Sequence, residues 1–119
     1  MTPVSDRKQP DMLNTHTSVL ARRVRIDADF ATLPYEAGWA SEALLFTQVE
    51  GAHPELTITT EVSPDGINWI ARGEPQTLHE DGSIAESPLT VFGNWIRLVI
   101  RGATPERPAR VLVHVSLKG

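Results

Sequence analysis

The chain contains no cysteine among its 119 residues. This absence excludes disulfide bonds, thiolate catalysis and zinc–sulfur sites, and it leaves the redox compartment open. No apolar run approaches the roughly 18 residues that a membrane-spanning segment needs. The first ten residues, MTPVSDRKQP, also lack the apolar core of a signal peptide. We therefore expect a protein that is made in the cytoplasm and does not insert into a membrane.

An excess of positive charge is also missing, because the formal net charge is −4 at pH 7. Nucleic-acid binding requires clustered Lys and Arg, so we expect no nucleic-acid partner. Hydrophobic residues make up 40% of the chain and charged residues 22%, which is neither a disordered nor a membrane composition. A chain of this length normally forms one domain with a single core.

The N-terminal segment differs in character from the rest of the chain. Residues 1–17 are polar and show no sustained periodicity, and segments of this kind do not build a core. We predict an extended N-terminal arm over residues 1–17 and one domain over residues 18–119. Met12 and Leu13 are adjacent large apolar side chains in the arm, and we expect them to contact a partner.

Short segments with turn residues between them follow from residue 18 onward. Residues 23–30 (RVRIDADF) alternate polar and apolar positions, which is the period of a half-exposed strand. Residues 42–49 (EALLFTQV) are apolar enough for a strand that is buried on both faces. Only residues 34–45 leave room for a helical turn. The remaining predicted strands are residues 56–62, 67–72, 76–79, 84–91, 95–101 and 109–118.

About eight short strands with turns every eight to twelve residues are typical of an antiparallel sandwich or barrel. We predict an all-β fold, an antiparallel β-sandwich of the jelly-roll type. One turn has clear chemistry: Pro64 presets the first central φ, and Gly66 tolerates the positive φ that follows. This predicts a tight hairpin turn.

Catalytic and metal-binding patterns are absent from the sequence. The four histidines are His16, His53, His79 and His114. None has HxH, HxxxH or HExxH spacing, so we expect each at the surface, with His79 the best ligand candidate because two carboxylates follow it. Asp27 and Asp29 share a strand face with two arginines, which suits a solvated stripe better than a calcium or glycosidase site. We expect no catalytic site, no bound metal and no cofactor.

Aromatic residues make up only 6% of the chain, so each large ring needs an explanation. Trp95 alternates with Ile96 and shares the phase of Arg97, which predicts that its ring lies on the outer side of a sheet. Exposed Trp rings stack on the apolar faces of sugars, and Trp is also enriched where protein surfaces meet. Trp39 and Trp95 are therefore candidates for glycan stacking, with a subunit contact or a second buried layer as the competing interpretation.

Two segments resemble known β-sandwich modules. Residues 61–69 (EVSPDGINW) resemble the S-x-D-G-x-x-W hairpin of discoidin-like and phage-virion modules, and residues 92–100 (FGNWIRLVI) are similar to the G-x-[FWY]-[ILV]-R-[ILV] strand that usually follows it. The resemblance covers residues 56–118. It implies a jelly-roll sandwich with a non-catalytic role in attachment, in decoration of a particle or in glycan contact. The missing cysteines and signal sequence favour an assembly-bound module over a secreted lectin.

These observations predict a structural or assembly module, a subunit or accessory protein of a larger, virion-like particle. Its partners would be other protein subunits, in a homo-oligomer or a large assembly. Leu44, Phe46 and Leu112 are apolar residues left over on outward strand faces, and we assign Leu112 to the partner-binding set with Met12 and Leu13. An exposed sheet edge and an arm are common ways to join neighbours.

Two other classes of function stay open. One is a carbohydrate-binding module that uses Trp39 or Trp95 as a stacking platform. The other is a small cupin-like metalloenzyme on the same jelly roll. Its metal would need histidines from two facing strands, and the spacing of the histidines does not supply them.

Overall fold

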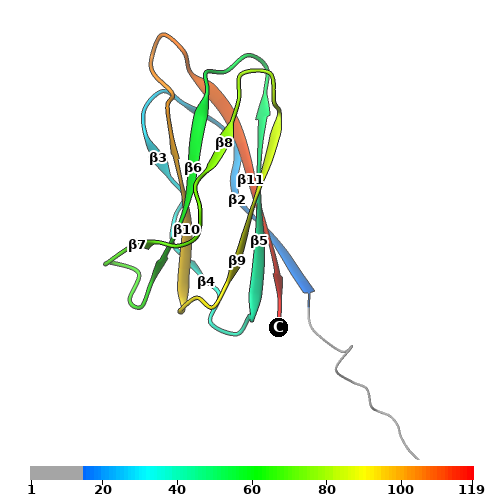
Figure 1. The fold of residues 1–119 in the computed structure, drawn as a ribbon, viewed down its shortest axis with the longest axis vertical. Helices are drawn as coiled ribbons and strands as arrows, with labels where there is room; N and C mark the ends of the chain where they lie inside the picture. Colours follow the sequence, from blue (N-terminus) through cyan, green and yellow to red (C-terminus); the bar gives the residue numbers. More distant parts are fainter. Residues whose placement is uncertain (1–14) are drawn as a thin grey trace, which may run out of the picture.

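The computed structural model describes residues 15–119, which form ten β-strands and no helix (Figure 1). In this part of the chain no helix is long and apolar enough to cross a membrane. The strands are β2 (Thr15–Ile26), β3 (Phe30–Ala31), β4 (Tyr35–Glu36), β5 (Glu42–Glu50), β6 (Leu56–Ser63), β7 (Ile70–Ala71), β8 (Gln76–Leu78), β9 (Ile84–Thr90), β10 (Trp95–Arg101) and β11 (Ala109–Lys118).

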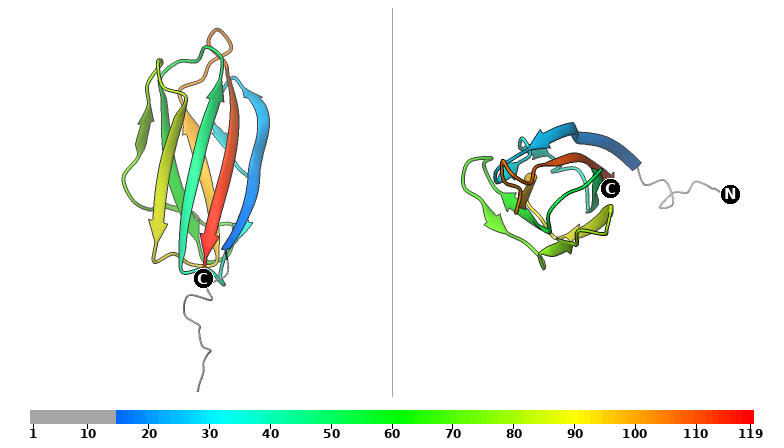
Figure 2. Two further views of the ribbon diagram at one scale, coloured as in Figure 1. Left: turned by 90° about the vertical axis from the view of Figure 1, so that its right-hand side faces the viewer. Right: turned by 90° about the horizontal axis from the view of Figure 1, so that it is seen from above.

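The strands form two antiparallel sheets that pack face to face (Figure 2). One sheet has four strands in the order β2-β11-β5-β9. In the other, β10 and β6 are central, β3 and β4 flank β10, and β7 and β8 flank β6. Each pair of short strands fills one edge position, so both sheets have four positions. The resulting eight-position order is that of a jelly roll, which confirms the predicted fold class.

The core lies between the two sheets and is built by strand alternation. Every second residue of β11 and β10 faces the opposite sheet and is completely buried. Full burial of such a side chain contributes about 1.5–3 kcal/mol. The fully buried aliphatic side chains are Leu45, Leu56, Ile58, Ile96, Leu98, Ile100, Val111, Val113, Val115 and Leu117.

The strand predicted across residues 23–30 is wrong in its bounds. β2 ends at Ile26, the chain bends over residues 27–29, and Phe30 already belongs to the other sheet. Alternation continues across this corner because Ile26 and Phe30 both pack on the same core. The strand also begins earlier than expected. Residues 15–17, which the sequence placed in the arm, pair with the end of β11.

Three further expectations are corrected by the structure. The helical turn within residues 34–45 does not form, since Tyr35 and Glu36 pair with β10 instead. The strand predicted over residues 67–72 shortens to the two residues of β7. The strand over residues 42–49 is fully buried on one face only, because every second residue of β5 lies half-buried on the outside.

The edge strand β2 is irregular where it pairs with β11. Its register shifts twice, around Leu20 and around Arg22 and Arg23, and Arg23 has a positive φ of 49°. The Arg23 side chain bonds Glu50 at 2.9 Å, and Arg110 donates a hydrogen bond to the Arg23 carbonyl oxygen at 3.0 Å. Bulges of this kind twist an edge and oppose the addition of another strand.

Candidate functional site on the outer face of the four-stranded sheet

We call one surface of the β2-β11-β5-β9 sheet the outer face. It is the surface that points away from the core. Figure 2 (left) shows its four strands side by side. β11 contributes Arg110, Leu112, His114, Ser116 and Lys118 to this face. β5 contributes Glu42, Leu44, Phe46, Gln48 and Glu50. In register with these, β2 adds Thr15, Thr17, Val19 and Arg25, and β9 adds Ile84, Glu86, Pro88 and Thr90.

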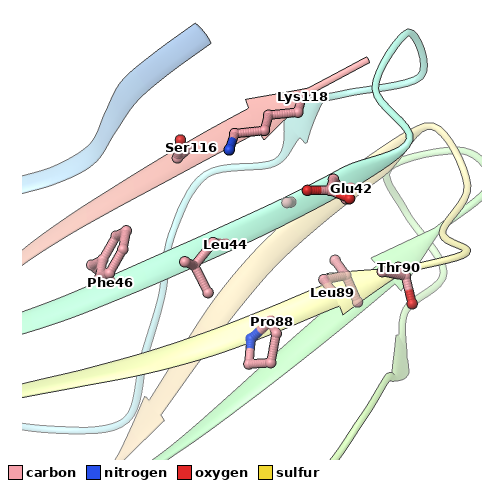
Figure 3. Close-up of a pocket in the computed structure, with 9 residues that line it drawn as sticks. Glu42, Leu44, Phe46, Pro88, Leu89, Thr90, Ser116 and Lys118 are labelled. Atoms are coloured by element: carbon pink, nitrogen blue, oxygen red, sulfur yellow. The ribbon is translucent and has the colours of Figure 1, made fainter. Parts of the chain in front are cut away.

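A groove of about 300 Å³ runs along the outer face between β5 and β9 (Figure 3). Leu44, Phe46 and Pro88 line its apolar part, and Leu44 lies directly opposite Pro88 in the strand pairing. Glu42 and Lys118 lie at one end, where they are opposite each other on β5 and β11. The groove therefore combines an apolar floor with a charged rim.

The predicted partner-binding residues divide between this face and the segment before it. Leu112 lies half-buried on the outer face, opposite Gln48 of β5. Met12 and Leu13 lie outside the described residues. The described chain begins at Thr15, which pairs with Lys118 at the groove end of the outer face. β2 therefore begins at the end of the face that carries the groove.

Charge is divided across the outer face. The β2–β11 half carries the cations Arg25, Arg110 and Lys118, and the β5–β9 half carries Glu42, Glu50 and Glu86. Arg25 pairs with Asp27 at 3.2 Å, and Glu50 pairs with Arg23 at 2.9 Å. Among residues 15–119, Arg110, Lys118, Glu42 and Glu86 form no ion pair. Sequence reasoning found the apolar residues of the face but missed this division, because it depends on which strands are neighbours.

Trp39 lies at a second surface site with a different chemistry. Its side chain is 47% exposed, and the His16 ring meets it edge to face with centroids 6.5 Å apart. The Ser18 hydroxyl lies 3.0 Å from His16 Nε2 and 2.7 Å from the Tyr35 hydroxyl. With Thr15, these rings border a hollow of about 380 Å³. An exposed indole beside hydroxyl and imidazole groups is suited to contact a polar ring such as a sugar.

Trp95 lies on the outer side of the other sheet, in phase with Arg97 as predicted. Its ring is partly covered by the Pro64–Gly66 turn: a Cβ added at Gly66 would lie 3.5 Å from two atoms of the indole. Arg97 lies 4.4 Å from the centroid of Trp69 and pairs with Glu61 at 2.7 Å. These contacts occupy the aromatic surface near Trp95, so Trp39 presents the better stacking platform.

The expectation that every histidine lies at the surface is wrong for His53. This residue is only 4% exposed, and its Nδ1 and Nε2 atoms each lie 2.7 Å from a backbone carbonyl oxygen, of Pro54 and Gly82. Arg107 donates a hydrogen bond to the His53 carbonyl oxygen at 3.2 Å. His53 thus joins three loops at one end of the sandwich. Neighbouring Gly51 and Pro54 indicated a turn in the sequence, but not that the turn folds inward.

The other histidines lie in places that agree with the sequence. His16 and His79 are exposed, and His114 is on the outer face. His79, the best ligand candidate, contacts one carboxylate, Glu55, at 3.1 Å. Within residues 15–119 no three His, Asp or Glu side chains lie close enough together to hold a metal ion.

The hairpin that carries the discoidin-like motif is stabilised by its own side chains. Asp65 Oδ1 accepts hydrogen bonds from the amides of Ile67 and Asn68, both at 2.9 Å, and from the Ser63 hydroxyl. Asp65 Oδ2 accepts one from the Asn68 side chain at 2.7 Å. These bonds, led by the Asn68 amide, hold the pKa of Asp65 well below its usual value. The motif therefore has a sufficient explanation in folding the turn.

No known protein family and no curated protein matches this chain in sequence. The resemblance of residues 56–118 to discoidin-like and phage-virion modules therefore stays a prediction.

Proposed function

We propose that this protein is a non-catalytic structural module that joins neighbouring subunits of a larger, virion-like particle through its outer face. The observation that carries the proposal is the apolar centre of that face, formed by Leu44, Phe46 and Leu112, which lie on the side of the sheet away from the core. An apolar centre surrounded by charged residues is the usual anatomy of a protein–protein interface. Aromatic side chains such as Phe46 commonly dominate the binding energy there.

The structure of the two sheet edges favours association through the outer face over the addition of a strand at an edge. The bulges of β2 and the positive φ of Arg23 disturb the edge on one side. On the other side, Pro88 removes a backbone donor from the exposed edge of β9. Both devices oppose edge-to-edge pairing. Contacts with neighbours are therefore better made by the side chains of the outer face.

The arm is the second contact in this proposal. Met12 and Leu13 precede Thr15 by three and two residues in the sequence, and Thr15 lies at the groove end of the outer face. Full burial of both side chains on a neighbouring subunit would contribute about 3–6 kcal/mol. Ordering the arm without a partner costs about 1–2 kcal/mol per residue. The arm therefore gains most from a surface that another subunit provides.

Light scattering of the purified protein over a concentration series tests this proposal. We expect a mass above that of the monomer that rises with concentration, and its loss in Phe46→Glu. Ile67→Glu is the matched control, because Ile67 is an apolar residue that is 79% exposed and lies outside the outer face. A native protein that stays monomeric throughout, or equal effects of the two substitutions, contradicts the proposal.

Glycan binding at Trp39 is the second candidate, and the polar groups beside its exposed ring favour it. It predicts that a panel of oligosaccharides contains one that quenches tryptophan fluorescence saturably. Quenching that is lost in Trp39→Phe and retained in Trp95→Phe would support this candidate. No response to any sugar of the panel would count against it. The cupin-like metalloenzyme gains no support from the histidines of residues 15–119.

A further inference from the structure

The charges of the outer face form a pattern that can complement itself. Lys118 and Glu42 are directly opposite each other at one end of β11 and β5, and Arg110 and Glu50 are opposite each other at the other end. Both cations are on β11 and both anions are on β5. The midpoint between these pairs is the row of His114 and Phe46. The line between β11 and β5 thus separates positive from negative along the whole face.

We infer that a second copy of this chain packs its outer face on the first, about a two-fold axis that runs along the strands between β11 and β5. Rotation about such an axis places β11 of one copy over β5 of the other. Each pair of opposite residues on these strands keeps its position along the strand direction. Lys118 of one copy then faces Glu42 of the other, and Arg110 faces Glu50, which also pairs with Arg23. Each contact occurs twice, as symmetry requires of an isologous interface. The inference rests on the proposed function and specifies its partner.

The charges also exclude the other way of placing two copies face to face. A two-fold axis that ran across the strands would keep β11 over β11 and reverse its direction. Lys118 would then face Arg110 of the second copy, and Glu42 would face Glu50. Opposed like charges are destabilising. The pattern therefore selects the axis along the strands.

Phe46 and Leu44 pack against side chains of β11 near the centre of the interface under this symmetry. Phe46 of one copy lies over His114 of the other, beside the second Phe46, and Leu44 lies over Ser116. Stacked sheets pack about 10 Å apart with strand directions within about 30° of each other, which twisted sheets achieve around such an axis. Nine residues of β5 across four strands give a footprint of roughly 15 by 27 Å. A footprint of roughly 400 Å² per copy is below the size of stable interfaces, so we expect a weak dimer that dissociates on dilution.

Mixing two charge-reversal variants tests the inference. In a homodimer of the Lys118→Glu variant, the new carboxylate of each copy faces Glu42 of the other copy. In a homodimer of the Glu42→Lys variant, the new ammonium group of each copy faces Lys118 of the other. We expect each variant alone to dimerise at least about ten-fold more weakly than the native protein, since each change acts twice. In an equimolar mixture each reversed residue meets its complement, so the heterodimer should form with a Kd within about three-fold of the native value. Sedimentation velocity measures the dimer Kd of each variant alone and of the equimolar mixture.

The mixture separates contacts between copies from contacts within one chain, because Lys118 and Glu42 are also neighbours in the same sheet. Arg101→Glu and Glu74→Lys, which reverse exposed charges elsewhere, are the matched control and should dimerise like the native protein, alone and mixed. If the mixture associates no better than either variant alone, the inferred pairing is wrong. If the native protein associates and Phe46→Glu prevents it while the charge variants change nothing, the proposed function stands and the axis is refuted. A native protein that never associates refutes both.

Discussion

At the scale of single residues, Gly66 occupies a backbone position that few other residues adopt. Its φ is +78°, and the Trp95 ring lies beside the position of the missing Cβ. We expect Gly66→Val to destabilise the domain by about 1 kcal/mol or more, which urea unfolding measures. Gly73→Val has a similar φ of +83° but nothing within 4 Å, so it isolates the backbone strain. An unchanged unfolding midpoint for Gly66→Val would contradict the assignment of the turn.

Asp65 makes a pH-dependent contribution to stability. Hydrogen bonds lower its pKa in the folded state, so the ionised carboxylate stabilises the fold above the unfolded-state pKa of about 3.9. That contribution is lost as pH falls through the lower folded-state pKa. We expect Asp65→Asn to lower the melting temperature at pH 7, and its difference from the native protein to narrow between about pH 5 and pH 2. Asp81→Asn, at an exposed turn, is the control. A constant difference across this range would contradict the account.

At the scale of strands, the sequence was sufficient wherever a long alternation ended at clear turn residues. β10 and β11 have the bounds predicted for them, because Gly102–Pro108 separates two uninterrupted runs of period two. β3, β4 and β7 have two residues each, too few to show a period. Alternation also gives no information on which strands become neighbours. The apolar residues of the outer face were therefore predictable, whereas its division of charge was not.

The two faces of the four-stranded sheet should respond differently to the same substitution. Leu117 is completely buried between the sheets, whereas Leu44 is half-buried on the outer face. We expect Leu117→Ala to destabilise the domain by about 2–5 kcal/mol. Leu44→Ala should cost clearly less in unfolding free energy but weaken self-association. Equal losses of stability in urea unfolding, with association unchanged in Leu44→Ala, would show that Leu44 belongs to the core.

Removal of the arm tests its role. Deletion of residues 1–13 leaves every described strand pair intact, since β2 begins at Thr15. We expect the melting temperature of the dilute protein to stay nearly unchanged and the association measured by light scattering to weaken. Replacing only Met12 and Leu13 by Ser should reproduce the loss of association. A shortened protein that unfolds at a lower temperature and associates normally would place the arm in the domain itself.

At the scale of the whole molecule, the jelly roll presents two unlike surfaces. The outer side of the β3-β10-β6-β7 sheet carries Trp95 under the Gly66 turn and Trp69 under Arg97. The outer face carries an apolar centre with opposite charges on its two halves. β2 begins at the end of that face where β11 also ends (Figure 1). One face of the molecule thus gathers the features expected of an assembly contact.

The distance between two copies tests this account most directly. The chain has no cysteine, so Thr90→Cys carries a single nitroxide at the exposed end of β9, and any dipolar coupling between labels arises between molecules. With the axis along the strands, standard strand and sheet spacings place the two Thr90 Cα atoms roughly 17–18 Å apart, so the nitroxides lie within about 25 Å of each other. Double electron–electron resonance should detect this distance, and Phe46→Glu should abolish it. A distance of about 30 Å or more, as an axis across the strands requires, or no coupling at concentrations where the protein associates, would contradict the account.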